Sequence, residues 1–347
     1  MPIVEKILSK MPQDTAAWVS APVNCRYLSG FSGSNCLCLI SRAGAFYLTD
    51  RRFLEAAQKS ITALEVRNIE SLDELLDSLP ERRFAIETAH TTLAALDQRR
   101  EKYPRLEFDL SGDLDIILRE KRAVKTQEEV DCVRRAQSIA EAALERVLPN
   151  IRAGRTEREI ALELDYTMFS LGAQALSFDT IAVAGENGSL PHGVPTNRKL
   201  CDGDLLTLDF GAVVDGYHSD MTRTFAIGKS SEEQERIYNL VLEAQLAGIA
   251  AVSAGAECKA VDAAVRAVFE RAGVLEFFAH GTGHGVGLLV HESPTVSPKS
   301  AEILQEGMII TIEPGLYLPG RFGVRIEDMI LVGGGNLTEV DKSLRRL

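Results

Sequence analysis

The sequence predicts an α+β protein with two domains, a smaller N-terminal α/β domain and a larger C-terminal domain that contains two similar halves. Two observations support this prediction. Short apolar runs alternate with amphipathic stretches over the N-terminal third, and a pattern of glycines, apolar positions and carboxylates occurs twice in the remainder. A chain of 347 residues is also long for a single hydrophobic core.

The composition narrows the class of protein. Apolar residues make up 45% of the chain and charged residues 25%, which is typical of a globular protein. The formal net charge of −12 argues against a nucleic-acid partner, which would require a basic face. No segment has the length and apolar character of a signal peptide or a membrane span. The six cysteines are scattered without zinc-site spacing. We therefore expect a cytoplasmic protein with reduced thiols and neither a nucleic-acid nor a membrane partner.

The N-terminal third reads as alternating strands and helices. Strands are predicted by "AAWVSA", "NCLCLIS", "AFYLTD" and "RFAIE", and helices by "RRFLEAAQKS", "SLDELLDSLP" and "TLAALDQRREKY". These segments hold few residues suited to catalysis. The charged stretch "REKRAVKTQEEV" near residue 120 marks a boundary, so we predict domains at 1–122 and 123–347.

A long amphipathic helix is predicted at the start of the second domain. Thr126 and Glu129 have the spacing of a capping box, in which each residue satisfies a free backbone N–H at the helix N-terminus. The following apolar positions recur on one helical face. They are Val130, Val133, Ala140, Leu144 and Val147.

The remainder of the chain contains an internal repeat. "AGRTEREIALELDYTMFSLGA" from residue 153 matches "AGAECKAVDAAVRAVFERAGV" from residue 254. Downstream, "HGVPT" from His192 matches "HESPT" from His291, and "GDLLTLD" ending at Asp209 matches "GMIITIE" ending at Glu313. Two copies that pack together would be related by a pseudo-twofold axis. The repeat therefore predicts that Asp209 faces Glu313 and that His192 faces His291.

A β-hairpin is predicted within the first copy. Asp215-Gly216 in "DFGAVVDGYHSDM" has the sequence of a two-residue primed turn. Counting outward from this turn makes Asp209 and Asp220 diagonal neighbours on one face. Such neighbours lie about 7–8 Å apart, close enough for both carboxylates to reach a shared centre.

Two further carboxylates are predicted to join them from the second copy. Glu313 ends the strand "IITIEP", and "GVRIEDMILV" places Arg325 and Glu327 on one face of another strand. Each carboxylate alone would usually be solvated at a strand end, but the paired spacing within a repeat favours convergence. Converging carboxylates either share protons or bind cations. Two divalent ions would balance the four charges, and a pair about 3.5–4 Å apart activates a bridging water for hydrolysis.

Residues 280–294, "HGTGHGVGLLVHESP", combine three histidines with alternating glycines. Alternating glycine allows another backbone or a ligand to approach closely. A phosphate-binding loop is the competing interpretation, but the segment has neither the strand–loop–helix context nor the lysine of such a loop. One of these histidines could complete an oxygen-rich metal site, and that donor set suits manganese, cobalt or iron better than structural zinc.

Several motifs resemble the dinuclear metallopeptidases of the "pita-bread" fold, which include Xaa-Pro dipeptidases (prolidases), aminopeptidase P and methionine aminopeptidases. They are "LDFGAVVDGYHSDMTRTF", "HGTGHGVGLLVHESP", "IEPGLY" and "VRIEDMILV", and the resemblance covers residues 123–347. "YLSGFSGSNCLCLI" and "YLTDRRF" resemble the creatinase-type domain that precedes the catalytic domain in prolidases and aminopeptidase P.

The resemblance implies roles for particular residues. His192 and His291 match histidines that contact the peptide and stabilise the tetrahedral intermediate, and Glu313 matches the proton shuttle. His280 and Arg325 match residues beside the metal cluster, whereas His90 and His218 are expected to be ordinary structural or surface histidines. The five positions that match metal ligands are Asp209, Asp220, His284, Glu313 and Glu327.

The resemblance also implies a substrate, a cofactor and an assembly. We predict hydrolysis of Xaa-Pro bonds in small peptides, as an Xaa-Pro dipeptidase, with aminopeptidase P as the alternative. The N-terminal domain argues against methionine aminopeptidase. Intact ligand positions argue against a non-catalytic binding protein and against metal-free creatinase. Two divalent ions are expected per subunit, with manganese or cobalt favoured over iron or zinc, in a homodimer.

Overall fold

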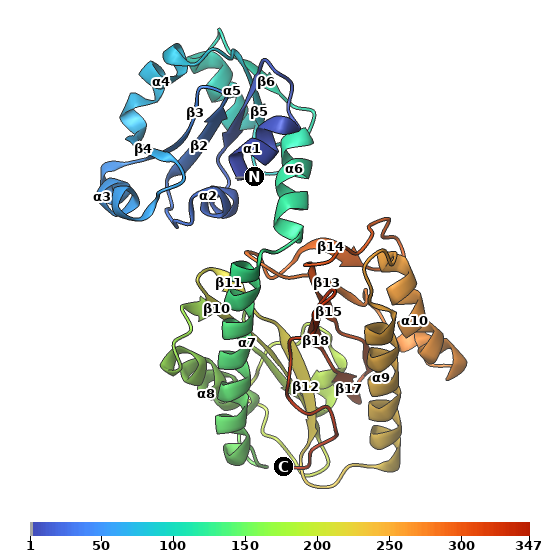
Figure 1. The fold of residues 1–347 in the computed structure, drawn as a ribbon. Helices are drawn as coiled ribbons and strands as arrows, with labels where there is room; N and C mark the ends of the chain where they lie inside the picture. Colours follow the sequence, from blue (N-terminus) through green and yellow to red (C-terminus); the bar gives the residue numbers. More distant parts are fainter. Residues whose placement is uncertain (1–2) are drawn as a thin grey trace. The chain divides into compact units, whose positions relative to one another are not determined.

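The computed structural model describes residues 3–347 and divides into two compact units, Met1–Arg122 and Ala123–Leu347 (Figure 1). Residues 1 and 2, with which the predicted N-terminal domain begins, lie outside the described residues. Within the described chain, no helix is both long and apolar enough to cross a membrane.

The first unit is a six-stranded mixed sheet with helices. Its strand order is β4-β3-β2-β1-β5-β6, with β1 antiparallel to β2 and parallel to β5. Successive residues of β1 pack into two separate apolar clusters, because neighbouring side chains in a strand point to opposite faces. The predicted strands and helices are confirmed. The elements are β1 Thr15–Val19, β2 Cys36–Ser41, β3 Gly44–Thr49, β4 Glu65–Asn68, β5 Arg83–Ile86, β6 Glu107–Asp109, α1 Ile3–Ser9, α2 Pro22–Ser29, α3 Arg51–Ser60, α4 Leu72–Ser78, α5 Leu93–Lys102 and α6 Asp113–Ala123.

Four long helices flank the strands of the second unit, α7 and α8 on one side and α9 and α10 on the other (Figure 1). The capping box of Thr126 and Glu129 at the start of α7 is confirmed, and the predicted apolar face of this helix is buried. The helices are α7 Gln127–Val147, α8 Glu157–Ser170, α9 Glu232–Ala251 and α10 Cys258–Arg271.

The internal repeat is confirmed in the backbone. Helices α8 and α10 both have 14 residues. Gly154 and Gly255 precede them with φ angles of 92° and 88°, a left-handed conformation that favours glycine. The N–H of each glycine donates to a backbone carbonyl of its own copy, Leu200 in the first and Leu304 in the second, at 2.8 Å in both cases.

The strands of the second unit form several small sheets between the helices. The two that matter for the site have the orders β12-β9-β8 and β14-β13-β15-β18-β19, one from each copy. A bridge between Thr222 and Glu327 links the copies. The strands are β7 Ala175–Leu176, β8 Ile181–Ala184, β9 Leu205–Phe210, β10 Ala212–Val214, β11 Tyr217–His218, β12 Met221–Ala226, β13 Gly283–Gly285, β14 Glu292–Val296, β15 Ile309–Ile312, β16 Gly315–Leu318, β17 Phe322–Arg325, β18 Asp328–Leu331 and β19 Gly335–Asn336.

The predicted hairpin is confirmed, with a bend that the sequence did not reveal. Asp215 and Gly216 have φ angles of 49° and 75°, as a type I′ turn requires, and the register set by this turn continues into the pairing of β9 with β12. At Gly211 the strands approach so closely that a Cβ would lie 1.9 Å from the carbonyl oxygen of Ser219. The hairpin divides between two sheets at this position, with β10 and β11 in one and β9 and β12 in the other.

The prediction of one strand carrying both Arg325 and Glu327 is wrong. Strand β17 ends at Arg325 and pairs with β16, whereas β18 begins at Asp328 and pairs with β15. Between them, the N–H of Glu327 donates to the carbonyl of Thr222 at 3.1 Å. The chain changes partners at this link, so the two side chains come from the ends of different strands.

Candidate metal centre

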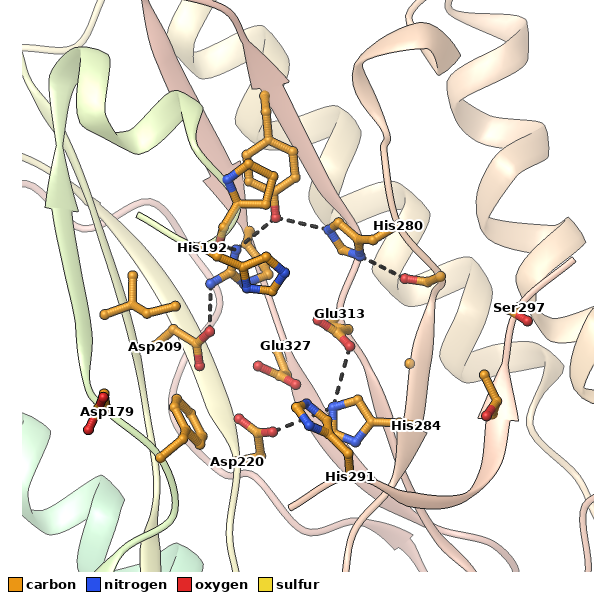
Figure 2. Close-up of a pocket in the computed structure, with 18 residues that line it drawn as sticks. Asp179, His192, Asp209, Asp220, His280, His284, His291, Ser297, Glu313 and Glu327 are labelled. Carbon is orange, nitrogen blue, oxygen red and sulfur yellow. Dashed lines mark hydrogen bonds and ion pairs between the residues drawn. The ribbon is translucent and has the colours of Figure 1, made fainter. Parts of the chain in front are cut away.

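A cavity of about 580 Å³ opens within the second unit and receives side chains from both copies of the repeat (Figure 2). Asp209 lies in β9, and Asp220 immediately precedes β12. In the second copy, Glu313 follows β15 and Glu327 precedes β18. All four predicted carboxylates line the cavity, as do the predicted residues His192, His280, His284, His291 and Arg325.

The glycines around His284 are explained by close approach of neighbouring backbones. A Cβ on Gly283 would lie 1.9 Å from the carbonyl oxygen of Thr311, and one on Gly285 would lie 2.2 Å from that of Ser293. Strand β13 can therefore pack between its neighbours only without side chains at these positions. His284 is left to project into the cavity between two glycines.

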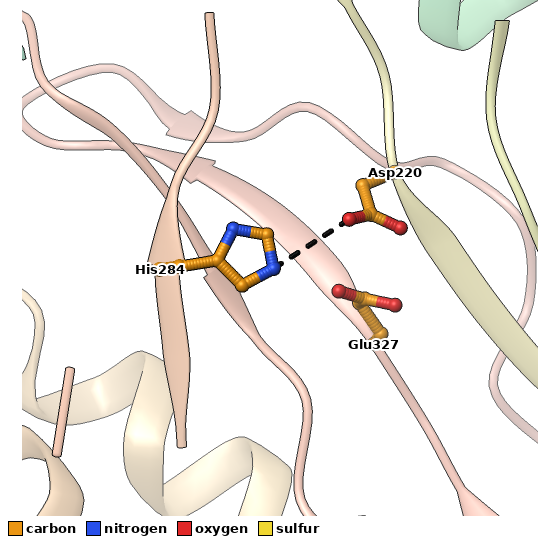
Figure 3. Close-up of side chains that lie close together, drawn as sticks. All are labelled: Asp220, His284 and Glu327. Carbon is orange, nitrogen blue, oxygen red and sulfur yellow. Dashed lines mark ion pairs between the residues drawn. The ribbon is translucent and has the colours of Figure 1, made fainter. Parts of the chain in front are cut away.

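Three side chains come close enough to share one ion. Asp220, His284 and Glu327 each offer a ligand atom, and these atoms lie within 4.8 Å of one another (Figure 3). The Nε2 atom of His284 is 3.6 Å from Asp220 Oδ2 and 3.5 Å from Glu313 Oε1. Figure 2 shows Asp209 and Glu313 beside this group, so all five proposed ligands border one space.

The electrostatics of this group favour a cation. Burial, followed by repulsion from neighbouring carboxylates, raises the pKa of Asp220 and of Glu327 well above the usual range. Burial also raises the pKa of Glu313 to about 8 and lowers that of His284 to about 4. Carboxyls that resist ionisation beside a neutral imidazole are stabilised as ligands when a divalent ion supplies the missing charge.

An unpaired oxygen supports the same interpretation. Asp209 accepts a hydrogen bond from Arg325 Nη2 through Oδ2 at 2.5 Å, but its buried Oδ1 has no hydrogen-bond partner among residues 3–347. A buried carboxylate oxygen without a partner is costly. The residues present therefore fit divalent metal ions.

Arg325 connects the carboxylates to the cavity wall. Besides Asp209, it donates to Tyr317 Oη at 2.7 Å and to Thr222 Oγ1 at 3.1 Å. Thr222 in turn donates to Glu327 Oε2 at 2.7 Å. Since a guanidinium only donates, Asp209 Oδ2 is the acceptor of its bond with Arg325, and the contacts with Tyr317 and Thr222 hold the guanidinium in place for that bond.

The same logic fixes the direction of the bonds at His280. Tyr317 accepts from Arg325, so its own O–H is free to donate to His280 Nε2 at 2.9 Å. Nδ1 of His280 then carries the hydrogen and donates to the Gly281 carbonyl at 2.7 Å. Burial lowers the pKa of His280 to about 4, in agreement with this neutral tautomer.

His192 and His291 line the cavity from corresponding positions of the two copies (Figure 2). The ring of His291 packs edge-on against His284 at a centroid distance of 4.3 Å. Burial lowers the pKa of His291. Neither His90 nor His218 is among the cavity residues; the backbone N–H of His218 donates to the carbonyl of Gly287 at 2.8 Å.

Sequence reasoning missed several cavity residues, of which Tyr317 makes the most polar contacts. No strand periodicity connects it with Glu313, because β15 ends at Ile312 and Tyr317 lies in β16, which belongs to another sheet. The others lie in loops or at strand ends without a distinctive pattern. They are Phe178, Asp179, Ile181, Pro191, Thr295 and Ser297.

Comparison with known proteins gives matches over the whole chain. Residues 131–333 match the model of metallopeptidase family M24, and residues 6–124 match the creatinase/prolidase N-terminal domain. An Xaa-Pro dipeptidase of Pyrococcus furiosus is 33% identical over 98% of this chain and 99% of its own. The structure of an Xaa-Pro dipeptidase from Bacillus anthracis has a TM-score of 0.95 at 36% identity, and that of an X-Pro aminopeptidase from Thermotoga maritima has 0.92 at 32%. Each alignment covers 99% of both chains.

Proposed function

The chain belongs to metallopeptidase family M24, and from this premise we propose that it hydrolyses the bond before proline in Xaa-Pro dipeptides. The family match and the structural neighbours confirm the predicted α+β fold class and a metallo-exopeptidase activity. The observation that carries the substrate proposal is full-length similarity to Xaa-Pro dipeptidases, in a chain whose cavity collects four carboxylates and a neutral imidazole.

Divalent metal ions follow from the family, and we propose that five side chains hold two of them. Four oxygen donors around one imidazole suit manganese, cobalt or iron better than structural zinc, and among these the resemblance favours manganese or cobalt. The bound pair would act as a Lewis acid that lowers the pKa of a water molecule to the neutral range. The proposed ligands are Asp209, Asp220, His284, Glu313 and Glu327.

Glu313 is the proposed proton carrier. Its carboxylate borders the cavity beside His284, where it can accept a proton from the attacking water. The same proton is needed at the leaving nitrogen, because the C–N bond breaks readily only when that nitrogen leaves as a neutral amine. One carboxylate therefore serves as base in the first half of the reaction and as acid in the second.

His192 and His291 are the proposed donors to the carbonyl oxygen of the scissile bond. They approach from opposite copies of the repeat, so the substrate would lie between them (Figure 2). A neutral imidazole can donate one N–H to the developing oxyanion, and such donors act most strongly in a water-poor cavity. Arg325, supported by Tyr317 and His280, keeps Asp209 oriented.

Aminopeptidase P activity is the second candidate, supported by the similarity to the X-Pro aminopeptidase of Thermotoga maritima. The two activities differ in whether proline ends the substrate with a free carboxylate. We also propose a homodimer, as the resemblance to prolidases implies, which light scattering after size-exclusion chromatography would test.

The experiment that tests the proposed function is hydrolysis of Ala-Pro, Ala-Pro-Ala and Met-Ala-Ser by chelator-stripped protein, with and without manganese. Manganese-dependent cleavage of Ala-Pro alone supports the dipeptidase. Cleavage of Ala-Pro-Ala moves the assignment to aminopeptidase P, and cleavage of Met-Ala-Ser alone to methionine aminopeptidase. Inactivity on all three, despite bound metal, would contradict the proposal.

A further inference from the structure

Glu157 is a buried carboxylate outside the cavity. It lies in the first turn of α8 with a side chain that is fully inaccessible to solvent. Its position near a helix N-terminus suits a negative charge, but a buried carboxylate is tolerated only when hydrogen bonds replace its hydration. The donors that hydrogen-bond to the Glu157 carboxylate indicate its structural role.

Both oxygens of Glu157 accept hydrogen bonds, from the last residue of β8 and from the loop that follows it. Oε1 accepts from the N–H of Ala184 at 2.7 Å. Oε2 accepts from the hydroxyl and the N–H of Thr196 at 2.6 and 3.0 Å, and Asn187 Nδ2 reaches the same oxygen at 3.0 Å. The donors stand at the two ends of residues 185–196, which we call the His192 loop. The Glu157 carboxylate thus links both ends of the loop, beside a backbone bond from the N–H of Arg158 to the Thr196 carbonyl at 3.0 Å.

Two further contacts fix the His192 loop against the proposed centre. The carbonyl of Pro191 accepts from Arg325 Nη1 at 3.1 Å. Gly188 lies against Gly323 of β17, where a Cβ on Gly323 would be 2.0 Å from the carbonyl oxygen of Gly188. The loop is therefore placed relative to the arginine that also holds Asp209.

Apolar burial does little to hold the tip of this loop. Leu190 and Val194 are 56% and 74% exposed, and His192 is itself exposed. Without the hydrogen bonds at its base, the loop would sample other conformations, because polar anchors are what restrain an exposed segment.

The second copy of the repeat has no equivalent carboxylate. Cys258 occupies the position that corresponds to Glu157 and is also buried. The segment that carries His291 is instead held by a buried ion pair between Lys125 Nζ and Glu292 Oε1, at 2.8 Å. The two histidines are thus anchored by independent contacts, and a change at Glu157 should reach one of them only.

We propose that Glu157 is a positioning residue that acts on Xaa-Pro hydrolysis through His192, by closing the loop that carries it. This inference rests on the proposed function and on the role assigned there to His192. A misplaced catalytic donor lowers the rate even when the metal site is intact. Glu157 should therefore affect turnover without affecting metal binding.

The test is a pair of double-mutant cycles on manganese-loaded protein with Ala-Pro as substrate. Glu157→Gln removes one acceptor oxygen and should lower kcat on the order of tenfold. In a His192→Ala background the same change should have less than about a twofold effect, whereas in a His291→Ala background the full loss should persist. Manganese stoichiometry and affinity should match those of the wild type.

Hydrogen exchange supplies a readout besides activity. Amides of the His192 loop should exchange faster in Glu157→Gln, while those around His291 should not change. Glu163→Gln is the matched control, because Glu163 lies on the same helix and bonds to Asn150 and Arg155 instead. If Glu157→Gln does not fold, Thr196→Val removes the hydroxyl that donates to Glu157 and that accepts from Arg198 and Asn187. The loss of kcat and the faster loop exchange should then be the same in kind but smaller.

The outcomes separate the two proposals. If wild-type protein cleaves Ala-Pro but the losses from Glu157→Gln and His192→Ala multiply, or loop exchange is unchanged, the positioning role is wrong. If wild-type protein cleaves none of the Xaa-Pro substrates, the proposed function itself has failed.

Discussion

The two copies of the repeat share a backbone plan, but their side chains differ where chemistry is proposed. Each contributes to the cavity two of the four proposed ligand carboxylates and one of the two facing histidines, His192 or His291. Only the second contributes His284, and the first contributes Glu157 where the second has Cys258. Duplication therefore accounts for the symmetric carboxylates, while the single imidazole makes the two proposed metal positions unequal. Substitutions at these positions should show which differences between the copies matter for metal binding, turnover and stability.

The largest loss of activity and of bound metal is expected on substitution of His284, which has no counterpart in the first copy. His284→Ala should remove one of two bound manganese ions and lower kcat/KM for Ala-Pro by at least about a thousandfold, because one position loses its nitrogen ligand. Metal content by plasma emission and steady-state kinetics would check this. His218→Ala, which alters a histidine outside the cavity, is the control. Retention of both ions in His284→Ala would refute the assignment.

A smaller loss is expected when the facing histidines are removed. His192→Ala and His291→Ala should each lower kcat by about 10²–10³-fold, the usual effect of deleting an oxyanion donor. Both variants should keep two manganese ions, which distinguishes them from His284→Ala. An effect on metal content instead of turnover would show that a histidine is a ligand.

The next largest loss is expected at Arg325, which belongs to the second copy and hydrogen-bonds Asp209 of the first. Arg325→Lys should weaken manganese binding by about 10–100-fold, because a lysine cannot reproduce the contacts of Arg325 with Asp209, Thr222 and Tyr317. Isothermal titration would measure the affinity. Arg321→Lys, on an exposed arginine paired with Glu233, is the control. Equal affinity in Arg325→Lys and wild type would show that this link is dispensable.

The pH dependence of the metal-free protein follows from its raised carboxyl pKa values. Glu313 titrates at about 8 in the folded protein, against 4.5 as its ordinary value, so the folded state holds a proton that the unfolded chain has lost. This group therefore destabilises the fold increasingly as the pH rises from 4.5 to 8. Metal-free wild type should lose stability relative to Glu313→Gln over this range, as measured by urea unfolding. A difference that is constant with pH would contradict the assignment.

The smallest expected effect is a loss of stability on substitution of the two glycines that occupy matching positions in the repeat. Gly154→Ala and Gly255→Ala should each destabilise the protein by about 1–2 kcal/mol, because both positions have a positive φ that alanine adopts only with strain. A Cβ at either position would have no neighbouring atom within 4 Å, so the cost should come from the backbone conformation alone. Thermal unfolding would show whether the two costs agree. Unequal costs would mean that the two turns have diverged in spite of their matching geometry.

The sequence predicted most of the fold and the convergence of the carboxylates, for identifiable reasons. The Asp215-Gly216 turn determines the register of its hairpin, and that register places Asp209 and Asp220. The repeat then extends the argument to Glu313. These inferences succeed because turn chemistry and periodicity are local properties of the chain.

The features that escaped prediction depend on contacts between distant segments. The division between β17 and β18 arises where Glu327 pairs with Thr222 of the other copy, which no local pattern reveals. No sequence pattern marks Glu157 for burial, because the donors that satisfy its carboxylate lie 27 and 39 residues later in the chain. Tyr317 owes its place in the site to Arg325 and His280.

The most direct measurement is anomalous diffraction from crystals of the protein loaded with manganese. The account predicts two peaks within the cavity, ligated by Asp209, Asp220, His284, Glu313 and Glu327, with His192 and His291 outside the ligand shell. A single peak, or manganese bound away from these five residues, would contradict the proposal that the two copies of the repeat hold a dinuclear centre between them.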